Sequence, residues 1–225
     1  MQTDPHPIET SMVRYYAQRA AEYERIYHKP ERQEDLARLR EIMGESFAGK
    51  DVFEIACGTG FWTEVISNTA ESVLATDINE EVLAVARSKR YCGSGKVAFQ
   101  RLDIYELPEF PRKFSAGLAA FWWSHIPMNK RRAFISCFNR AFEPGARILI
   151  ADNRLVAGSS TPISRTDADG NTYQARKLDD GSAHEVLKNF PTEQELRDAF
   201  KGLGADLEFT WLKYFWVLTY KPIIT

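Results

Sequence analysis

The stretch Asp51-Val-Phe-Glu-Ile-Ala-Cys-Gly-Thr-Gly-Phe-Trp-Thr63 decides the fold. Its apolar run from Val52 to Ile55 is typical of a central parallel strand that is buried on both faces. Gly58 and Gly60 follow, and a helical pattern begins at Trp62. The two glycines permit backbone angles that side chains forbid, and a helix N-terminus favours an anionic group. A strand, a glycine-rich turn and a helix in this order predict a cradle for a polar ligand.

The glycine pattern separates two classes of nucleotide site. A dinucleotide site requires G-x-G-x-x-G, but Thr63 stands at the third glycine and Glu54 lies in the strand. The stretch instead resembles the first motif of class I S-adenosylmethionine-dependent methyltransferases, an acidic residue followed by G-x-G-x-G. Ala56 replaces the first glycine, and we expect the loop to tolerate this small residue. The resemblance implies that the cofactor is bound here by Glu54, Ala56, Gly58, Thr59, Gly60 and Trp62.

Composition limits the choice of partners. The chain has 225 residues and a formal net charge of -2, which provides no general attraction to nucleic acid or to an anionic membrane. Cys57, Cys92 and Cys137 lack metal-ligand spacing, so neither a zinc site nor a disulfide framework is expected. Met1–Pro7 does not resemble a signal peptide, and no 18-residue apolar run occurs. We expect a cytoplasmic monomer or homodimer with no metal, nucleic-acid or membrane partner.

Two helices are expected before the first strand, over residues 11–28 and 31–47. Residues 1–48 would thus form a helical lid that covers the cradle. The segment Tyr15-Tyr-Ala-Gln-Arg-Ala-Ala-Glu-Tyr23-Glu24 is similar to the Y-x-x-x-A-x-x-Y-D segment of many small-molecule methyltransferases. This resemblance implies that Tyr15 and Tyr23 line the cofactor site, and we place Tyr16 in the acceptor pocket. Core packing is the alternative role for these tyrosines.

Acidic residues follow the next two expected strands. Asp77 stands at the end of the strand 72–77, where a carboxylate can bind both hydroxyls of a ribose or can cap the next helix. The family resemblance implies that Asp77 and Ile78 contact the ribose side of the nucleoside. It also implies that Asp103 and Ile104, after the strand 96–100, contact the adenine, although Asp103 could be an ordinary loop residue.

An aromatic segment, Phe121-Trp-Trp-Ser-His125, ends the expected fourth strand at the edge where open α/β sheets bind ligands. We place Phe121 at the cofactor and Trp122 and Trp123 in the acceptor pocket, although alternation predicts that one tryptophan packs beneath the following helix. His125 could act as a general base, because its ordinary pKa is near neutrality, or could simply order the turn.

After the fifth strand, expected over 147–152, the chain no longer alternates between single strands and helices. Asp169-Gly170 and Asp180-Gly181 are hairpin turns that flank an alternating strand, so we expect a β-meander over residues 157–191 above the pocket. The spacing of Asp167 and Asp169 does not match a calcium loop. Arg154, at the end of the fifth strand, could hold a carboxylate of the acceptor or stack on a planar ring. Within the meander, Tyr173, Arg176 and His184 are further candidates for contact with the acceptor, and a solvated hairpin face is the alternative.

The resemblance covers nearly the whole chain. It implies a single methyltransferase domain over residues 1–225 with a three-layer, Rossmann-like α/β fold. The seven-stranded sheet would be parallel except for its last strand, with N-terminal helices and a β-hairpin insertion after strand 5. The implied activity is transfer of a methyl group from S-adenosyl-L-methionine to oxygen or nitrogen of a small molecule, with carbon and sulfur ranked after them. The alternatives are a non-catalytic S-adenosylmethionine sensor, an NAD-dependent dehydrogenase and an aminopropyltransferase.

Overall fold

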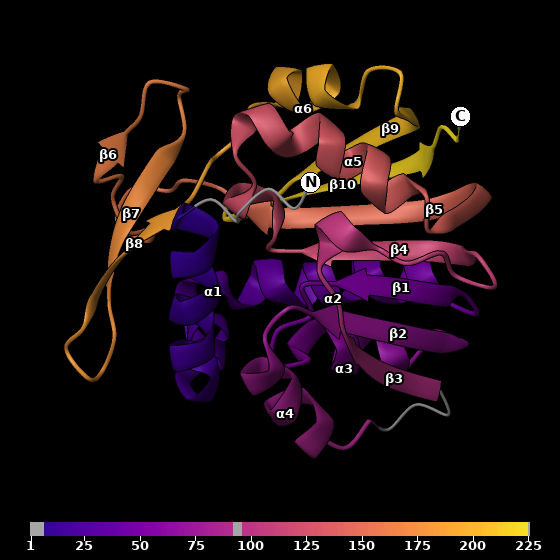
Figure 1. The fold of residues 1–225 in the computed structure, drawn as a ribbon, viewed down its shortest axis with the longest axis horizontal. Coiled ribbons are helices and arrows are strands. Elements are labelled where there is room, and N and C mark those ends of the chain that lie inside the picture. Colours follow the sequence, from indigo (N-terminus) through magenta and orange to yellow (C-terminus); the bar gives the residue numbers. More distant parts are fainter. Residues whose placement is uncertain (1–6, 92–95, 225) are drawn as a thin grey trace.

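The computed structural model describes residues 7–91 and 96–224, and its centre is one seven-stranded sheet (Figure 1). Cys92 and Met1–His6, both considered above, lie outside the described residues. The strand order is β3-β2-β1-β4-β5-β10-β9. The strands are β1 (Asp51–Ile55), β2 (Ser72–Asp77), β3 (Lys96–Arg101), β4 (Phe114–Ala120), β5 (Phe142–Asn153), β9 (Gly204–Trp211) and β10 (Phe215–Pro222).

The direction of the strands agrees with the expectation. Strands β3, β2, β1, β4 and β5 pair in parallel, whereas β10 pairs antiparallel with both β5 and β9. Only β10 therefore runs against the others in this sheet. The parallel order reverses between β1 and β4, and the space beyond the carboxyl ends of these strands is where open α/β sheets bind ligands.

Helices cover both faces of the sheet, and this gives three layers. The helices are α2 (Gln33–Phe47), α3 (Phe61–Ser67), α4 (Glu80–Ser88), α5 (Arg131–Asn139) and α6 (Glu193–Phe200). Val52 of β1 points into a core shared with α2, α3 and α4, while its neighbour Phe53 points into a core shared with α5 and α6. Successive residues of a strand alternate between faces, so an apolar run such as β1 must be buried on both sides.

The N-terminal segment is less regular than expected. α1 (Pro7–Arg19) gives way to the 3₁₀ helix η1 (Ala20–His28), and the 3₁₀ turn η2 (Pro30–Arg32) precedes α2. The prediction of one continuous helix to His28 is therefore wrong in its second half. Residues three apart eclipse in a 3₁₀ helix, and Tyr23 and Ile26 have this spacing and pack together against the core below α2 and α3.

The inserted segment forms a separate three-stranded antiparallel sheet of β6 (Arg165–Thr166), β7 (Thr172–Lys177) and β8 (Ala183–Leu187). Gly170 and Gly181 have positive φ at its two turns, as the sequence predicts. Figure 1 shows this sheet beside α1, at the end of the main sheet where the parallel strands finish. Met12 and Tyr15 of α1 share an apolar cluster with Val186 and Leu187.

The start of β5 differs from the sequence prediction, and the start of α6 agrees with it. β5 begins at Phe142 rather than Arg147, because the Pro144-Gly145 pair lies within a bulge of the strand instead of before it. The capping box between Thr192 and Glu195 at the start of α6 is confirmed. In the described part of the chain, no helix is long and apolar enough to span a membrane.

Candidate functional site

The loop after β1 has the backbone of a ligand cradle. Ala56, Gly58 and Gly60 have φ of 49°, 56° and 79°, so the one residue that departs from the glycine pattern also adopts the left-handed region. A Cβ added to Gly58 would meet no atom within 4 Å, whereas one added to Gly60 would clash with the hydroxyl of Tyr91. Gly60 is therefore required by packing, and Gly58 leaves its backbone open to a ligand.

A cavity of about 390 Å³, which we name the main cavity, lies at the carboxyl ends of β1, β2 and β4. Much of its wall is apolar, with acidic side chains at two positions, Asp77 and Asp103. It brings together eight of the expected cofactor residues: Tyr23, Ala56, Gly58, Asp77, Ile78, Asp103, Ile104 and Phe121.

The two carboxylates of the main cavity are fixed by backbone N–H groups. Asp77 accepts hydrogen bonds from the N–H of Gly58 and of Asn79, both at 2.9 Å. Burial raises the pKa of Asp77, although these N–H groups act in the opposite direction. Asp103 accepts from the N–H of Tyr105 at 2.9 Å. A carboxylate offers about four acceptor positions, so each retains capacity for a ligand while it orders its own loop.

Four expected cofactor residues line neither this cavity nor the second one described below, because they support the cradle from behind. Glu54 is buried and accepts from the Thr63 hydroxyl at 2.6 Å, and burial raises the pKa of Glu54 to about 8. Thr59 donates to Glu24 at 2.6 Å. Trp62 packs in the core that the sheet shares with α2 and α3, and Gly60 is the N-cap of α3.

A second cavity, of about 90 Å³, adjoins the first, and we name it the basic cavity. Its wall comes from α1, η1, η2, the loop after β5 and the inserted sheet, and includes Tyr15. In the part of the chain that the structure describes, five cationic side chains line it, and no carboxylate does. These are Arg19, Lys29, Arg32, Arg176 and Lys188.

Four residues line both cavities and form the boundary between them: Tyr16, Tyr23, Phe121 and His125. His125 Nδ1 lies 2.7 Å from the carbonyl of Leu187, and its Nε2 lies 2.8 Å from the Tyr16 hydroxyl. Since a carbonyl only accepts, Nδ1 carries the proton and Nε2 accepts from Tyr16. Burial, and then the charge of Lys188, lower the pKa of His125 to about 3. The ring is therefore neutral, and its acceptor nitrogen is already engaged.

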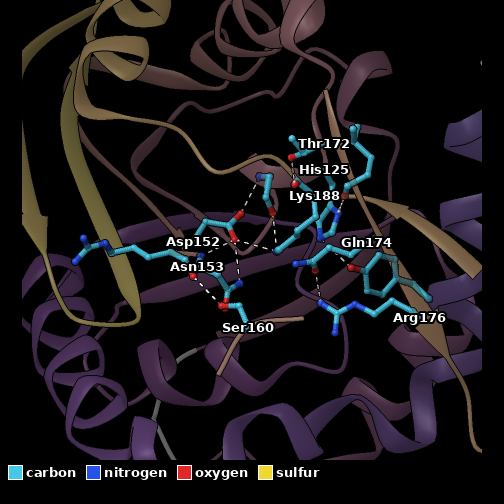
Figure 2. Close-up of polar contacts among 12 residues, drawn as sticks. His125, Asp152, Asn153, Ser160, Thr172, Gln174, Arg176 and Lys188 are labelled. Carbon is cyan, nitrogen blue, oxygen red and sulfur yellow. Dashed lines mark hydrogen bonds and ion pairs between the residues drawn. The ribbon is translucent and has the colours of Figure 1, made fainter. Parts of the chain in front are cut away.

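Lys188 follows β8 and is held by a buried ion pair (Figure 2). Its Nζ lies 3.1 Å from Asp152 and donates to the Ser124 hydroxyl at 2.6 Å. Burial alone raises the pKa of Asp152, but the charge of Lys188 and the N–H groups of Ser124 and Asn153 oppose it, and the net shift is downward. Burial lowers the pKa of Lys188, and the charge of Asp152 opposes that shift. This pair ties the inserted sheet to the end of β5.

The residues expected in the acceptor pocket divide into two groups. Trp122 lines the main cavity, but Trp123 is fully buried and stacks on Phe200, so one of the two tryptophans packs as alternation predicts and Trp123 does not face the acceptor pocket where we placed it. Arg154 lies over Trp211 and donates to a backbone carbonyl instead of facing either cavity.

Within the inserted sheet, Tyr173 donates to Asp167 at 2.8 Å and packs with α1, and it lines neither cavity. His184 contacts the ring of Tyr15 behind the basic cavity. Arg176 is the candidate from this sheet that reaches a cavity wall. The described residues contain no cluster of three or more His, Cys, Asp or Glu side chains that could hold a metal ion.

Sequence reasoning did not select most of the basic cavity. Arg19, Lys29 and Arg32 lie near the N-terminus and Lys188 lies far from them in the chain, and each alone resembles a solvated cation. One signal was available for Lys188, because a lysine directly after the apolar pair Val186-Leu187 is hard to place on a polar surface.

Comparison with known proteins agrees with this geometry. Residues 52–145 match the family model of a methyltransferase domain. The structure superposes on one described as "DhpI-SAM-HEP complex" with a TM-score of 0.80 and 25% identity, over 98% of this chain and 100% of that one. A second, "DhpI-SAH complex structure", gives a TM-score of 0.78 and 26% identity over 97% and 98% of the two chains. These similarities support a class I S-adenosylmethionine-dependent methyltransferase.

Sequence relatives carry methyltransferase names as well. An O-methyltransferase of Pyrenophora dematioidea is 30% identical over 152 residues, which are 66% of this chain and 55% of the relative. A ubiquinone biosynthesis O-methyltransferase of Dechloromonas aromatica (strain RCB) is 28% identical over 107 residues, 47% of this chain and 45% of that relative. This methyltransferase chain thus spans about half the length of these curated relatives.

Proposed function

We propose that this protein binds S-adenosyl-L-methionine in the main cavity and transfers its methyl group to an oxygen or nitrogen of a small molecule. The observation that carries the proposal is the meeting of the Gly58 loop, Asp77 and Asp103 around one cavity. At about 390 Å³ the cavity lies in the range of roughly 300–1,000 Å³ that is common for ligand pockets.

The side chains around the main cavity suit the parts of this cofactor. The open backbone at Gly58 would admit the methionine part, the remaining acceptor positions of Asp77 would bind the ribose hydroxyls, and Asp103 would accept from the adenine amine. Ile78 and Ile104 provide apolar contacts for the ring. When bound, the cofactor supplies an electrophilic methyl group on a positively charged sulfur.

The protein's own contribution is alignment and exclusion of water. The boundary residues Tyr16, Tyr23, Phe121 and His125 separate the main cavity from the basic cavity, and we propose that the acceptor reaches the methyl group there. Aromatic faces at this boundary favour a sulfonium cation. Neutral His125 fixes the Tyr16 hydroxyl at the boundary, so we assign it first to positioning and second to proton acceptance.

We also propose that the N-terminal helices act as a lid and that the inserted sheet covers the acceptor side, within one methyltransferase domain. The net charge of -2 supports a protein without nucleic-acid or membrane partners. We expect a cytoplasmic monomer or homodimer.

The test combines binding and turnover. Calorimetry with S-adenosylmethionine, S-adenosylhomocysteine and NADH should give binding of the two adenosyl ligands and none of NADH. Incubation with S-adenosylmethionine and a panel of hydroxyl and amine acceptors should then release S-adenosylhomocysteine. Adenosyl binding without turnover across a broad panel would favour the sensor function, and NADH binding would overturn the proposal.

A further inference from the structure

The basic cavity concentrates positive charge in a small space. Among the described residues, five cations and no carboxylate line this volume of about 90 Å³. They come from α1, η1–η2, β7 and the end of β8, so the fold brings them together from distant parts of the sequence.

The hydrogen-bond partners of three of these cations are neutral oxygens. Lys29 donates to the Ser159 carbonyl at 2.6 Å, and Arg32 donates to the Ser159 hydroxyl at 2.9–3.0 Å. Arg176 donates to the Thr161 hydroxyl at 2.7 Å and to the side-chain oxygen of Gln174 at 2.6 Å (Figure 2). These bonds orient the cations without neutralising them.

The remaining two cations add to the excess. Arg19 lies 5.4 Å and 5.7 Å from the ring centres of Tyr23 and Tyr15, a contact with aromatic faces that leaves its charge uncompensated. Lys188 is paired with Asp152, which lies behind the wall. Among the described residues, Glu31 and Asp35 also act on Arg32 by their charge, but neither lines the cavity, so cations outnumber the carboxylates close to it.

The cations also affect one another. Burial first, and then Arg32, lower the pKa of Lys29, while the exposed Glu31 opposes this shift. Burial is also the first cause that lowers the pKa of Arg176, and Arg19 adds to it. Buried like charges cost free energy unless an anion compensates them. The clustered cations therefore destabilise the folded protein, and a bound anion would offset this loss of stability.

We propose that the basic cavity binds an oxyanion group, phosphoryl or carboxylate, of the methyl acceptor. Arginine guanidinium groups match the geometry of such oxyanions, and lysine supplies additional charge. The shared boundary at Tyr16 and His125 then holds the rest of the acceptor toward the main cavity. The assignment to the acceptor rests on the proposed methyltransferase function, whereas binding of the oxyanion does not.

Calorimetric titration with inorganic phosphate and with acetate, in the absence of cofactor, tests the proposal. Wild type should bind at least one of them, and the preferred ion identifies the phosphoryl or carboxylate class. Arg176→Gln and Lys29→Gln should each weaken binding at least fivefold. Arg165→Gln is the matched control, since Arg165 lies on the same inserted sheet in an exposed ion pair with Glu185 and should leave binding unchanged.

The outcomes separate this proposal from the proposed function. Failure of folded wild type to bind either ion, or equal binding by wild type, Arg176→Gln and Lys29→Gln, would overturn the oxyanion site. S-adenosylhomocysteine affinity, measured on the same samples, should change less than twofold in these variants. Oxyanion binding without adenosyl binding would leave the anion site standing and would refute the methyltransferase function.

Discussion

The buried pair of Asp152 and Lys188 predicts a large and pH-dependent loss of stability in Lys188→Met. The lysine Nζ lies 3.1 Å from Asp152, and the two side chains are 8% and 0% exposed. Methionine has similar length but cannot compensate the charge, so Asp152 would remain buried with neutral donors alone: the backbone N–H of Ser124 and the backbone and side-chain N–H groups of Asn153. Removing one partner of such a pair costs about 3–5 kcal/mol.

The pH dependence follows from the changed pKa of Asp152 in the variant. Without Lys188, burial dominates and raises the pKa of Asp152 above its ordinary value of 3.8. A folded-state pKa above the unfolded one contributes stability that is complete below 3.8 and is lost as the pH rises through the folded pKa. The deficit of the variant should therefore be larger at pH 8 than at pH 5.

Urea denaturation of wild type and variant at both pH values measures this effect. The double variant Asp152→Asn/Lys188→Met should recover part of the loss, because it removes the uncompensated charge. Arg165→Gln, which breaks an exposed pair with Glu185, should cost less than about 1 kcal/mol. A deficit below about 1 kcal/mol in Lys188→Met at pH 8, or one that does not depend on pH, would refute the reasoning.

Three further predictions concern single positions. Ala56→Gly should raise the free energy of unfolding by about 0.5–1 kcal/mol in chemical denaturation, because the position has positive φ; an unchanged or lower value would contradict this. Burial raises the pKa of Glu54 to about 8. The stability that the protonated Glu54 contributes is therefore complete below pH 4.5 and is lost as the pH rises through about 8. Glu54→Gln should therefore be more stable than wild type at pH 9 but not at pH 6, and denaturation at both values checks it. His125, with a pKa near 3, should remain neutral from pH 8 to pH 5 in NMR of its ring nitrogens, and titration near pH 6.5 would sink the assignment.

Local patterns were sufficient to predict the fold. The strand, glycine loop and helix from Asp51 to Thr63, the end of β2 at Asp77 and both turns of the inserted sheet depend on residues that are close in sequence. Eight of the cofactor residues that these patterns and the family resemblance predict line the main cavity, whereas Glu54, Thr59, Gly60 and Trp62 do not. The change from α1 to η1 was missed because apolar spacings of three and four residues occur in both kinds of helix, and Tyr23, Ile26 and Tyr27 fit either.

The basic cavity could not be predicted in the same way. Arg32 and Ser159 are 127 positions apart, and Lys188 and Asp152 are 36 apart. Their meeting depends on how the inserted sheet packs against α1, which no local periodicity encodes. Trp123 and Trp122 illustrate the same limit, since alternation predicts that one is buried but not which one.

Calorimetric titration of S-adenosylhomocysteine into wild type and Asp77→Asn tests the central assignment most directly. Asparagine keeps the shape and one acceptor oxygen of Asp77, so the loop bond from Gly58 or Asn79 can be retained while the charge is lost. Wild type should bind, and the variant, at unchanged melting temperature, should bind about tenfold or more weakly, because charge-assisted hydrogen bonds contribute about 1.5–3 kcal/mol. No binding by folded wild type, or equal affinity in both proteins, would contradict the assignment of the main cavity to an adenosyl cofactor.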